Sequence, residues 1–181
     1  MEVIHISRLQ KASAIFGIVG PVINAMVFTI LGYVYPGYNP ISQFISELAT
    51  PEAPHNTIMN ILGFVVFGFY LIFFGIGLYL SVKKHILTTI CMILFILSGI
   101  CIFALSMFPC DVGCRNETFT GIGHNLLILF PTYAMPIAMI LSVYPVFIDL
   151  TLVNGLVQRL GLSVPLSWIF IMSIKIYRLA D

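Results

Sequence analysis

Residues 86–108 read ILTTICMILFILSGICIFALSMF and contain no charged side chain. A helix needs about 20 consecutive apolar residues to cross a bilayer, so this run predicts a transmembrane helix. Two similar runs precede it, Ala12–Val34 and Thr57–Val82. A spanning chain must be helical or a closed barrel, because lipid offers the backbone no hydrogen-bond partners. These runs far exceed barrel strands in length, so the sequence predicts an all-α, polytopic transmembrane helical bundle.

The composition of the whole chain agrees with a lipid environment. Of 181 residues, 60% are hydrophobic and 8% are charged, whereas soluble domains carry about 25% charged residues. The net charge of +1 argues against nucleic acid as a partner. We expect residues 1–181 to form a single integral membrane domain, with membrane lipids as partners and an oligomeric state that the sequence leaves open.

The number of crossings depends on the C-terminal third of the chain. A fourth apolar region runs from about Gly121 to Val153, and a short last run covers Leu160–Ile174. The fourth region is too long for one ordinary span and too short for two spans with a turn. Prolines at positions 131, 136 and 145 interrupt it. We expect six spans, with an abbreviated fifth helix near Leu141–Val153, and five spans with a kinked last region are the alternative.

Basic residues are concentrated on one side of the predicted bundle. They precede the first span, separate the second span from the third, and follow the last run: Arg8, Lys11, Lys83, Lys84, Lys175 and Arg178. Lys and Arg concentrate on the cytoplasmic side of membrane proteins. We therefore expect cytoplasmic N- and C-termini and two polar loops on the outer face.

The first polar loop, Asn39–Asn56, predicts a short amphipathic helix near residues 40–49. Asn39-Pro40 is a typical helix start, and apolar residues follow at positions 41, 44, 45 and 48. Ser46 and Glu47 lie among these residues, and His55 precedes the second span. A carboxylate beside apolar material needs a partner, and Glu47 has no basic neighbour in sequence. Helix capping is the structural interpretation of each of these polar side chains.

The second polar loop brings Asp111 to the same face. His124 lies about one turn inside the next apolar region, where its ring needs hydrogen-bond partners, and Asp111 or Glu47 is expected to orient it. Cys110 and Cys114 would form a small disulfide on an oxidising face. Free thiols and a metal site are the alternatives, and the lack of a second cysteine pair disfavours the metal.

Glu47, Asp111 and His124 suit three kinds of chemistry. They could be the N/O ligands of a divalent metal, the one cofactor that the sequence suggests. His124 could be a general base that activates water or Ser46, with a carboxylate behind it. The three groups could instead bind a polar lipid head without reaction. No H-E-x-x-H, G-x-S-x-G or phosphate-binding glycine loop supports catalysis. A hydrogen-bonded triad that holds three helices together is the structural alternative.

Gln158 and Arg159 complete the candidate set. In the six-span arrangement they lie at the outer face, where Arg159 would pair with Glu47 or Asp111, or hold a lipid phosphate or carboxylate. The alternative is an interfacial Arg that reaches lipid phosphates. The predicted ligand-binding residues are therefore Ser46, Glu47, His55, Asp111, His124, Gln158 and Arg159.

Several sequence motifs are shared with a known family. They are NPISQFISEL at 39–48, PHN at 54–56, FPCD at 108–111, GHN at 123–125 and GLVQR at 155–159. Together they resemble the family called domain of unknown function 998. The resemblance implies a prokaryotic integral membrane protein, usually with six spans, without an established activity. The chain is also faintly similar to eukaryotic autophagy-modulator and GPI-remodelling membrane proteins, which is an analogy only.

Three functional hypotheses follow. The first is a multi-pass protein of the prokaryotic plasma membrane whose outer-face polar pocket binds a lipid head group or small amphiphile. The second is a membrane-embedded lipid hydrolase or transferase that uses His124 with Glu47 and Asp111. The third is a structural or accessory membrane protein without a ligand. The sequence does not decide whether the protein is an enzyme.

Overall fold

The computed structural model describes residues 8–82 and 84–147, and the regular structure within them is helical. The long helices are α1 (Arg8–Val34), α3 (Val66–Ser81), α4 (Ile86–Leu105) and α5 (Phe119–Phe147). The short elements are the 3-10 helices η1 (Ile45–Ala49) and η3 (Val112–Cys114), the single turn α2 (Asn56–Ile58) and the π-helical segment η2 (Met59–Val65). Because α2 and η2 lead into α3 without a break, Asn56–Ser81 is one long helix.

Four helices among the described residues are long and apolar enough to cross a membrane. They are Arg8–Val34, Asn56–Ser81, Ile86–Leu105 and Phe119–Ser142. This confirms the prediction of an all-α, multi-pass membrane protein. The last predicted run, Leu160–Ile174, lies outside the described residues, as do Gln158 and Arg159.

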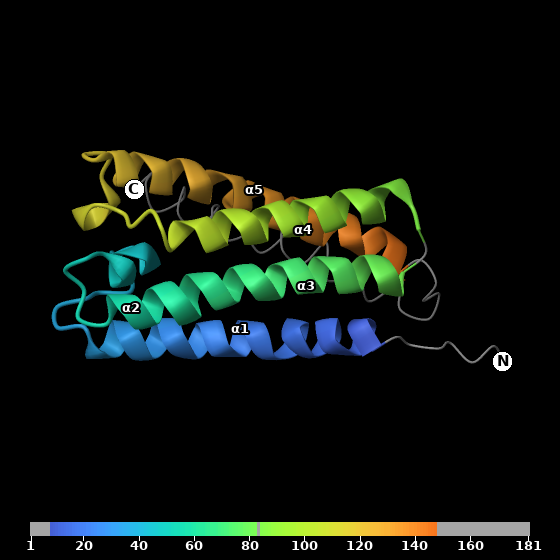
Figure 1. The fold of residues 1–181 in the computed structure, drawn as a ribbon, viewed down its shortest axis with the longest axis horizontal. Helices are drawn as coiled ribbons and strands as arrows, with labels where there is room; N and C mark the ends of the chain where they lie inside the picture. Colours follow the sequence, from blue (N-terminus) through green and yellow to red (C-terminus); the bar gives the residue numbers. More distant parts are fainter. Residues whose placement is uncertain (1–7, 83, 148–181) are drawn as a thin grey trace, which may run out of the picture. The chain divides into compact units, whose positions relative to one another are not determined.

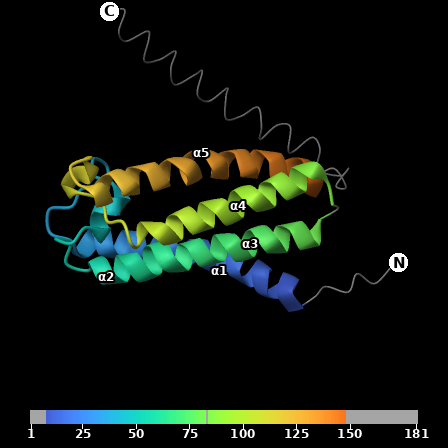
Figure 2. The same ribbon diagram turned by 45° about the horizontal axis from the view of Figure 1, so that its top comes forward.

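The long helices run up and down, side by side. Figure 1 and Figure 2 show α3 between α1 and α4, with α5 along the other side of α4. The polar segments 35–55 and 106–118 both lie at the end of the helices that is on the left of Figure 1. We call this end the loop end. It carries the predicted site residues that fall among the described residues.

Small and polar residues hold neighbouring helices together. At the α3–α4 contact, a side chain on Gly68 would lie 2.5 Å from the carbonyl oxygen of Gly99, so both positions require glycine for close backbone approach. Between α1 and η2, the buried Asn24 amide donates to the carbonyl oxygen of Gly63 at 3.1 Å. The widened turns of a π-helix leave carbonyl groups exposed to such donors, so Asn24 stabilises η2 next to the loop end.

Helix α5 differs from the prediction for the fourth apolar region. It is continuous from Phe119 to Phe147, so Pro131 and Pro136 lie inside the helix and do not interrupt it. A helix in lipid tolerates proline because nearby groups re-satisfy the freed backbone atoms. Residues 141–147 continue α5, so the prediction of a separate helix that begins near Leu141 was wrong. The remainder of that predicted helix lies outside the described residues.

Candidate functional site

The first polar loop folds into two separate turns. Asn39 starts the first turn, where its backbone carbonyl oxygen accepts the backbone N–H of Gln43 at 2.9 Å. The backbone of Phe44 is extended, with φ −73° and ψ 144°, and η1 begins after it. The predicted continuous amphipathic helix near 40–49 is therefore wrong. Its predicted apolar face is also divided, since Ile41 is 95% exposed whereas Leu48 is 2% exposed.

Glu47 explains why the helix breaks. One carboxylate oxygen accepts the backbone N–H of Phe44 at 3.0 Å, and the other accepts the side-chain amide of Gln43 at 3.0 Å. A side chain that binds a nearby backbone N–H competes with the helical hydrogen-bond ladder. Glu47 was expected to pair with a basic residue. Its partners are instead a side-chain amide and a backbone N–H of its own loop. This geometry matches the capping interpretation of Glu47.

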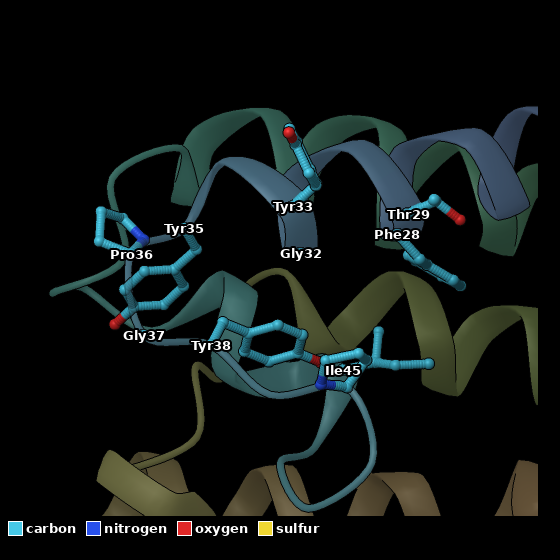
Figure 3. A pocket seen from close by; sticks show the side chains of 10 residues that line it. Phe28, Thr29, Gly32, Tyr33, Tyr35, Pro36, Gly37, Tyr38 and Ile45 are labelled. Atoms are coloured by element: carbon cyan, nitrogen blue, oxygen red, sulfur yellow. The ribbon is translucent and has the colours of Figure 1, made fainter.

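An aromatic cavity lies between the end of α1 and the first loop. Its volume is about 700 Å³, and its walls include Phe28, Tyr35, Tyr38 and Ile45. Figure 3 shows the rings of Phe28, Tyr35 and Tyr38 on the side of α1 that faces the loop, whereas Tyr33 points away. The sequence analysis missed this cavity, although three tyrosines within residues 33–38 were its visible signal.

Tyr38 connects the cavity to Glu47. The Tyr38 and Tyr35 rings are stacked, with their centroids 6.1 Å apart, and the Tyr38 hydroxyl donates to the carbonyl oxygen of Phe44 at 3.3 Å. Burial, and then the negative charge of Glu47, raise the pKa of Tyr38 above its ordinary value. The aromatic wall therefore lies within the electrostatic field of a carboxylate.

In the second polar loop, Asp111 is bound to the start of α5. Its carboxylate accepts the backbone N–H groups of Glu117 and Thr118 at 2.8 and 2.9 Å, and the Thr118 hydroxyl at 2.6 Å. The hydroxyl of Thr118, followed by its backbone N–H, holds the pKa of Asp111 below its ordinary value. A side chain on Gly121 would collide with this carboxylate. Asp111 thus anchors the loop to the N-terminus of α5, where negative charge is favourable.

Thr118 caps α5 while it binds Asp111. Its hydroxyl oxygen accepts the backbone N–H of Gly121 at 3.1 Å, which is the usual geometry of a threonine N-cap. The same hydroxyl lies 2.9 Å from the hydroxyl of Thr120. Asp111, Thr118 and Gly121 therefore fix the first turn of α5, and the next turn carries His124.

His124 is buried beneath the second loop. Its side chain is 1% exposed, and Nδ1 lies 2.7 Å from the carbonyl oxygen of Phe108. The ring of Phe64 from η2 lies 6.2 Å away, centroid to centroid. The second ring nitrogen, Nε2, is buried and has no hydrogen-bond partner among the described residues. Neither predicted carboxylate therefore hydrogen-bonds to His124, because its one bond goes to a backbone carbonyl.

Two cysteines lie next to His124. Cys110 and Cys114 form a disulfide, and the two sulfur atoms and a His124 ring nitrogen all lie within 4.8 Å of one another. Gly113 and Cys114 have left-handed backbones, with φ of 67° and 49°. This conformation costs free energy for a residue with a side chain, and the hydrogen bond from the Cys114 N–H to the carbonyl oxygen of Asp111, at 2.7 Å, supports it.

The two polar loops meet at a second, smaller cavity of about 290 Å³. The first loop contributes Pro51 and Glu52 to its walls, and the second contributes Cys110, Asp111 and Thr118, among others. Glu117 also lines this cavity. Three carboxylates surround the space, so it is an acidic cavity suited to cations.

The structure brings together only part of the predicted site. Among the described residues, the group able to hold a metal is Cys110, Cys114 and His124. Glu47 and Asp111 do not belong to that group, so the predicted Glu47–Asp111–His124 ligand set is not assembled. Ser46 is half-buried in η1, and the His55 side chain is exposed just before α2.

These features define the class of the molecule as a multi-pass helical membrane protein whose polar groups gather at one end of its spans. The chain belongs to the family of proteins of unknown function DUF998, whose model matches residues 18–148. The matched residues contain both polar loops and His124. No curated protein and no solved structure matches the sequence.

Proposed function

We propose that this protein binds an amphiphile with an ammonium head group, such as a zwitterionic lipid, at the loop end. The observation that carries the proposal is the aromatic cavity of about 700 Å³ beside Glu47. Ligand cavities are usually about 300–1,000 Å³ and mostly apolar, with a few polar groups. The cavity thus has the size and the lining that a small amphiphile needs.

The cavity extends along both the membrane helix and the loop, as an amphiphile requires. Phe28, Thr29 and Gly32 belong to the last turns of α1, and Pro36, Tyr38 and Pro40 belong to the loop. An acyl chain would lie along α1, and its head group would lie beside the Tyr35 and Tyr38 rings. The occupant enters from the lipid, so it need not cross the polar loop.

Charge favours a cationic head group. Aromatic faces attract ammonium groups, and this attraction strengthens where water is excluded. The described polar loops carry four carboxylates, Glu47, Glu52, Asp111 and Glu117, against the single cation Arg115. A phosphate-only or carboxylate head would meet repulsion at this end, whereas an ammonium group would be attracted.

The geometry gives less support to lipid hydrolysis. The carboxylates of Glu47 and Asp111 are occupied by hydrogen bonds within the loops and to the start of α5. The Nδ1 atom of His124 is bound to Phe108, so neither carboxylate orients the ring for base catalysis. Binding without reaction therefore accounts for more of the site.

Binding is tested on the detergent-purified full chain by native mass spectrometry. We expect a phosphocholine lipid to bind more tightly than a phosphoglycerol lipid with the same acyl chains. Tyr38→Ala should weaken binding of the choline lipid about tenfold, which lies within the range expected for one partly desolvated cation–π contact. Tyr133→Ala is the matched control, because Tyr133 is an exposed tyrosine on α5, away from the cavity.

Equal affinity for the two lipids would overturn the cationic specificity. Equal loss of binding in Tyr38→Ala and Tyr133→Ala would overturn the location. Glu47→Gln tests the cationic specificity separately from the location of the site, since it removes the charge and keeps an acceptor for the Phe44 N–H. We expect this variant to weaken binding of the phosphocholine lipid and to leave binding of the phosphoglycerol lipid unchanged.

We also propose that the loop end faces the outside of a prokaryotic plasma membrane and that both termini are cytoplasmic after six crossings. The distribution of Lys and Arg supports this orientation. In cells, a cysteine in place of Glu52 should react with a membrane-impermeant maleimide, and one in place of Lys84 should not. A C-terminal reporter that is active only outside would contradict six crossings and favour five.

A further inference from the structure

We propose that Cys110, Cys114 and His124 form a zinc site that exists when the Cys110–Cys114 disulfide is reduced. The three residues come from η3, from the segment just before it and from α5. They would supply two thiolates and one imidazole, which is a ligand set that proteins use for Zn²⁺. The proposal is independent of amphiphile binding, because it uses none of the aromatic cavity residues.

The hydrogen bond of His124 prepares the other ring nitrogen for a metal. The carbonyl oxygen of Phe108 can only accept, so Nδ1 must carry the proton and donate it at 2.7 Å. In the neutral ring, Nε2 then has a free lone pair. A metal-ligating histidine usually donates its other ring N–H to such a carbonyl or to a carboxylate. The Phe108–His124 pair already has this arrangement.

The unpaired state of Nε2 is the second observation that points to a ligand. Buried side-chain nitrogen atoms almost always have a partner, because an unpaired one costs free energy. Within residues 8–82 and 84–147, Nε2 is buried without a partner, and His124 is 1% exposed. Because Nδ1 is bound to the Phe108 carbonyl, Nε2 is the ring nitrogen left to ligate a metal held by the two neighbouring sulfur atoms.

Burial and charge also suit a divalent ion. Cys110 is 2% exposed and His124 is 1% exposed, so a net charge at this position would be costly. Two thiolates cancel the charge of Zn²⁺, which leaves a neutral complex with the imidazole. Because Cys110 also lines the acidic cavity of about 290 Å³, a water molecule in that cavity could take the fourth position of a tetrahedral ion.

The disulfide and the zinc site exclude each other. A dithiol reductant transfers two electrons and two protons to the Cys110–Cys114 bond, which breaks to give two thiols, and the reductant becomes a disulfide. Binding of Zn²⁺ then releases the two thiol protons to solvent. Once reduced, the two sulfur atoms can separate and bind one metal ion together with the His124 ring, a nitrogen of which lies within 4.8 Å of both sulfur atoms in the disulfide form.

The test compares zinc binding by reduced and oxidised full-length protein in detergent, with a phosphine as the reductant. After dialysis against zinc, we expect one Zn²⁺ per chain in the reduced protein and none in the oxidised protein. The reduced protein should also give a thiolate-to-cobalt charge-transfer band with Co²⁺. Zinc in the oxidised protein, or none in the reduced protein, would overturn the proposal.

Variants test the three ligands separately. In His124→Asn, the amide nitrogen can replace Nδ1 as the donor to Phe108, but no atom replaces Nε2. We expect this variant to bind zinc more than about 100-fold more weakly than the wild type, because removing a ligand should cost more than removing an outer-shell partner. The control is His55→Asn, which replaces an exposed histidine of the first loop. This variant should bind zinc as tightly as the wild type. Unchanged zinc affinity in His124→Asn would remove His124 from the site.

A second pair of variants applies if His124→Asn does not fold. Cys114→Ser prevents the disulfide and removes one ligand, so zinc should be lost even under reducing conditions. Cys101→Ser, at a free cysteine inside α4, should retain one Zn²⁺ per chain. Retention in Cys114→Ser would overturn the proposal.

Discussion

In the first polar loop Glu47 binds Gln43 and Phe44, a few residues away, whereas in the second loop Asp111 binds across to the start of α5. The first loop leaves Ile41 and Phe44 exposed and borders the aromatic cavity. The second loop has a disulfide and covers a buried histidine. The Glu47 bonds join residues three and four positions apart and shape a local turn, whereas the Asp111 bonds join residues six and seven positions apart and tie the second loop to the start of α5.

The largest expected difference concerns the histidine of the first loop and the one in α5 beneath the second loop. His124→Ala should lower the free energy of unfolding by about 3 kcal/mol, because it removes a fully buried ring and leaves the Phe108 carbonyl unpaired. Because His55 is exposed, His55→Ala should lower the free energy of unfolding by less than about 0.5 kcal/mol. Reversible denaturation in mixed micelles measures both values. Similar costs for the two variants would break the comparison.

The disulfide should account for the next largest effect. Replacing both Cys110 and Cys114 by serine should cost about 2 kcal/mol, the value expected for closing so short a loop. Cys101→Ser in the wild-type background is the control for loss of a thiol. The double variant is measured in the absence of added metal, so that a bound ion does not replace the cross-link. No change in stability would show that Asp111 alone fixes the second loop.

A smaller effect is expected for the cap of α5. Thr118→Ala should cost about 1 kcal/mol, because it removes the N-cap of α5 and a donor to Asp111. Thr57→Ala is its counterpart at the first-loop side, where the hydroxyl donates to the side chain of the neighbouring Asn56. We expect less than about 0.5 kcal/mol there. The same denaturation measurement sharpens the comparison at the level of single hydroxyl groups.

The smallest effect is a dependence of the second loop on acid. Hydrogen bonds lower the pKa of Asp111 below its ordinary value of 3.8, so the carboxylate contributes stability that is fully present above pH 3.8. That contribution is lost as the pH falls below 3.8 and through the pKa of the folded state. Hydrogen-exchange protection of the Glu117 and Thr118 amides should fall over this range.

Asp111→Asn is the control for the acid effect. Asparagine cannot titrate, so the protection of the two amides should not change between neutral pH and pH 3 in this variant beyond the intrinsic pH dependence of exchange. An unchanged acid response in Asp111→Asn would assign the effect to another group.

Much of the fold could be predicted from apolar runs, because each span depends only on the length and composition of a continuous segment. The end of α1 at Val34 and the start of α4 at Ile86 follow from such runs, whereas α1 begins at Arg8, four residues before the predicted run. The continuity of α5 through Pro131 and Pro136 did not, since the proline pattern alone does not show how lipid-embedded helices compensate the lost bonds.

At the second loop the polar residues were predictable but their hydrogen-bond partners were not, and the aromatic cavity beside the first loop was missed. Asp111 and His124 were identified because polar groups beside spans are uncommon. Their partners were not, because the Phe108 carbonyl and the Thr118 hydroxyl are reached through the fold of the loop. Cys110, Cys114 and His124 come together only through the left-handed turn at Gly113 and Cys114, which the spacing C-x-x-x-C does not reveal.

Photo-crosslinking of a phosphocholine lipid tests the central claim, that the aromatic cavity at the loop end binds an ammonium-headed amphiphile. The lipid carries a diazirine close to its head group, and the labelled residues are located by mass spectrometry after proteolysis. We expect labels to concentrate within residues 28–45 and to decrease in Tyr38→Ala. Labels spread evenly over the lipid-facing side of α5, and unchanged in Tyr38→Ala, would contradict the account.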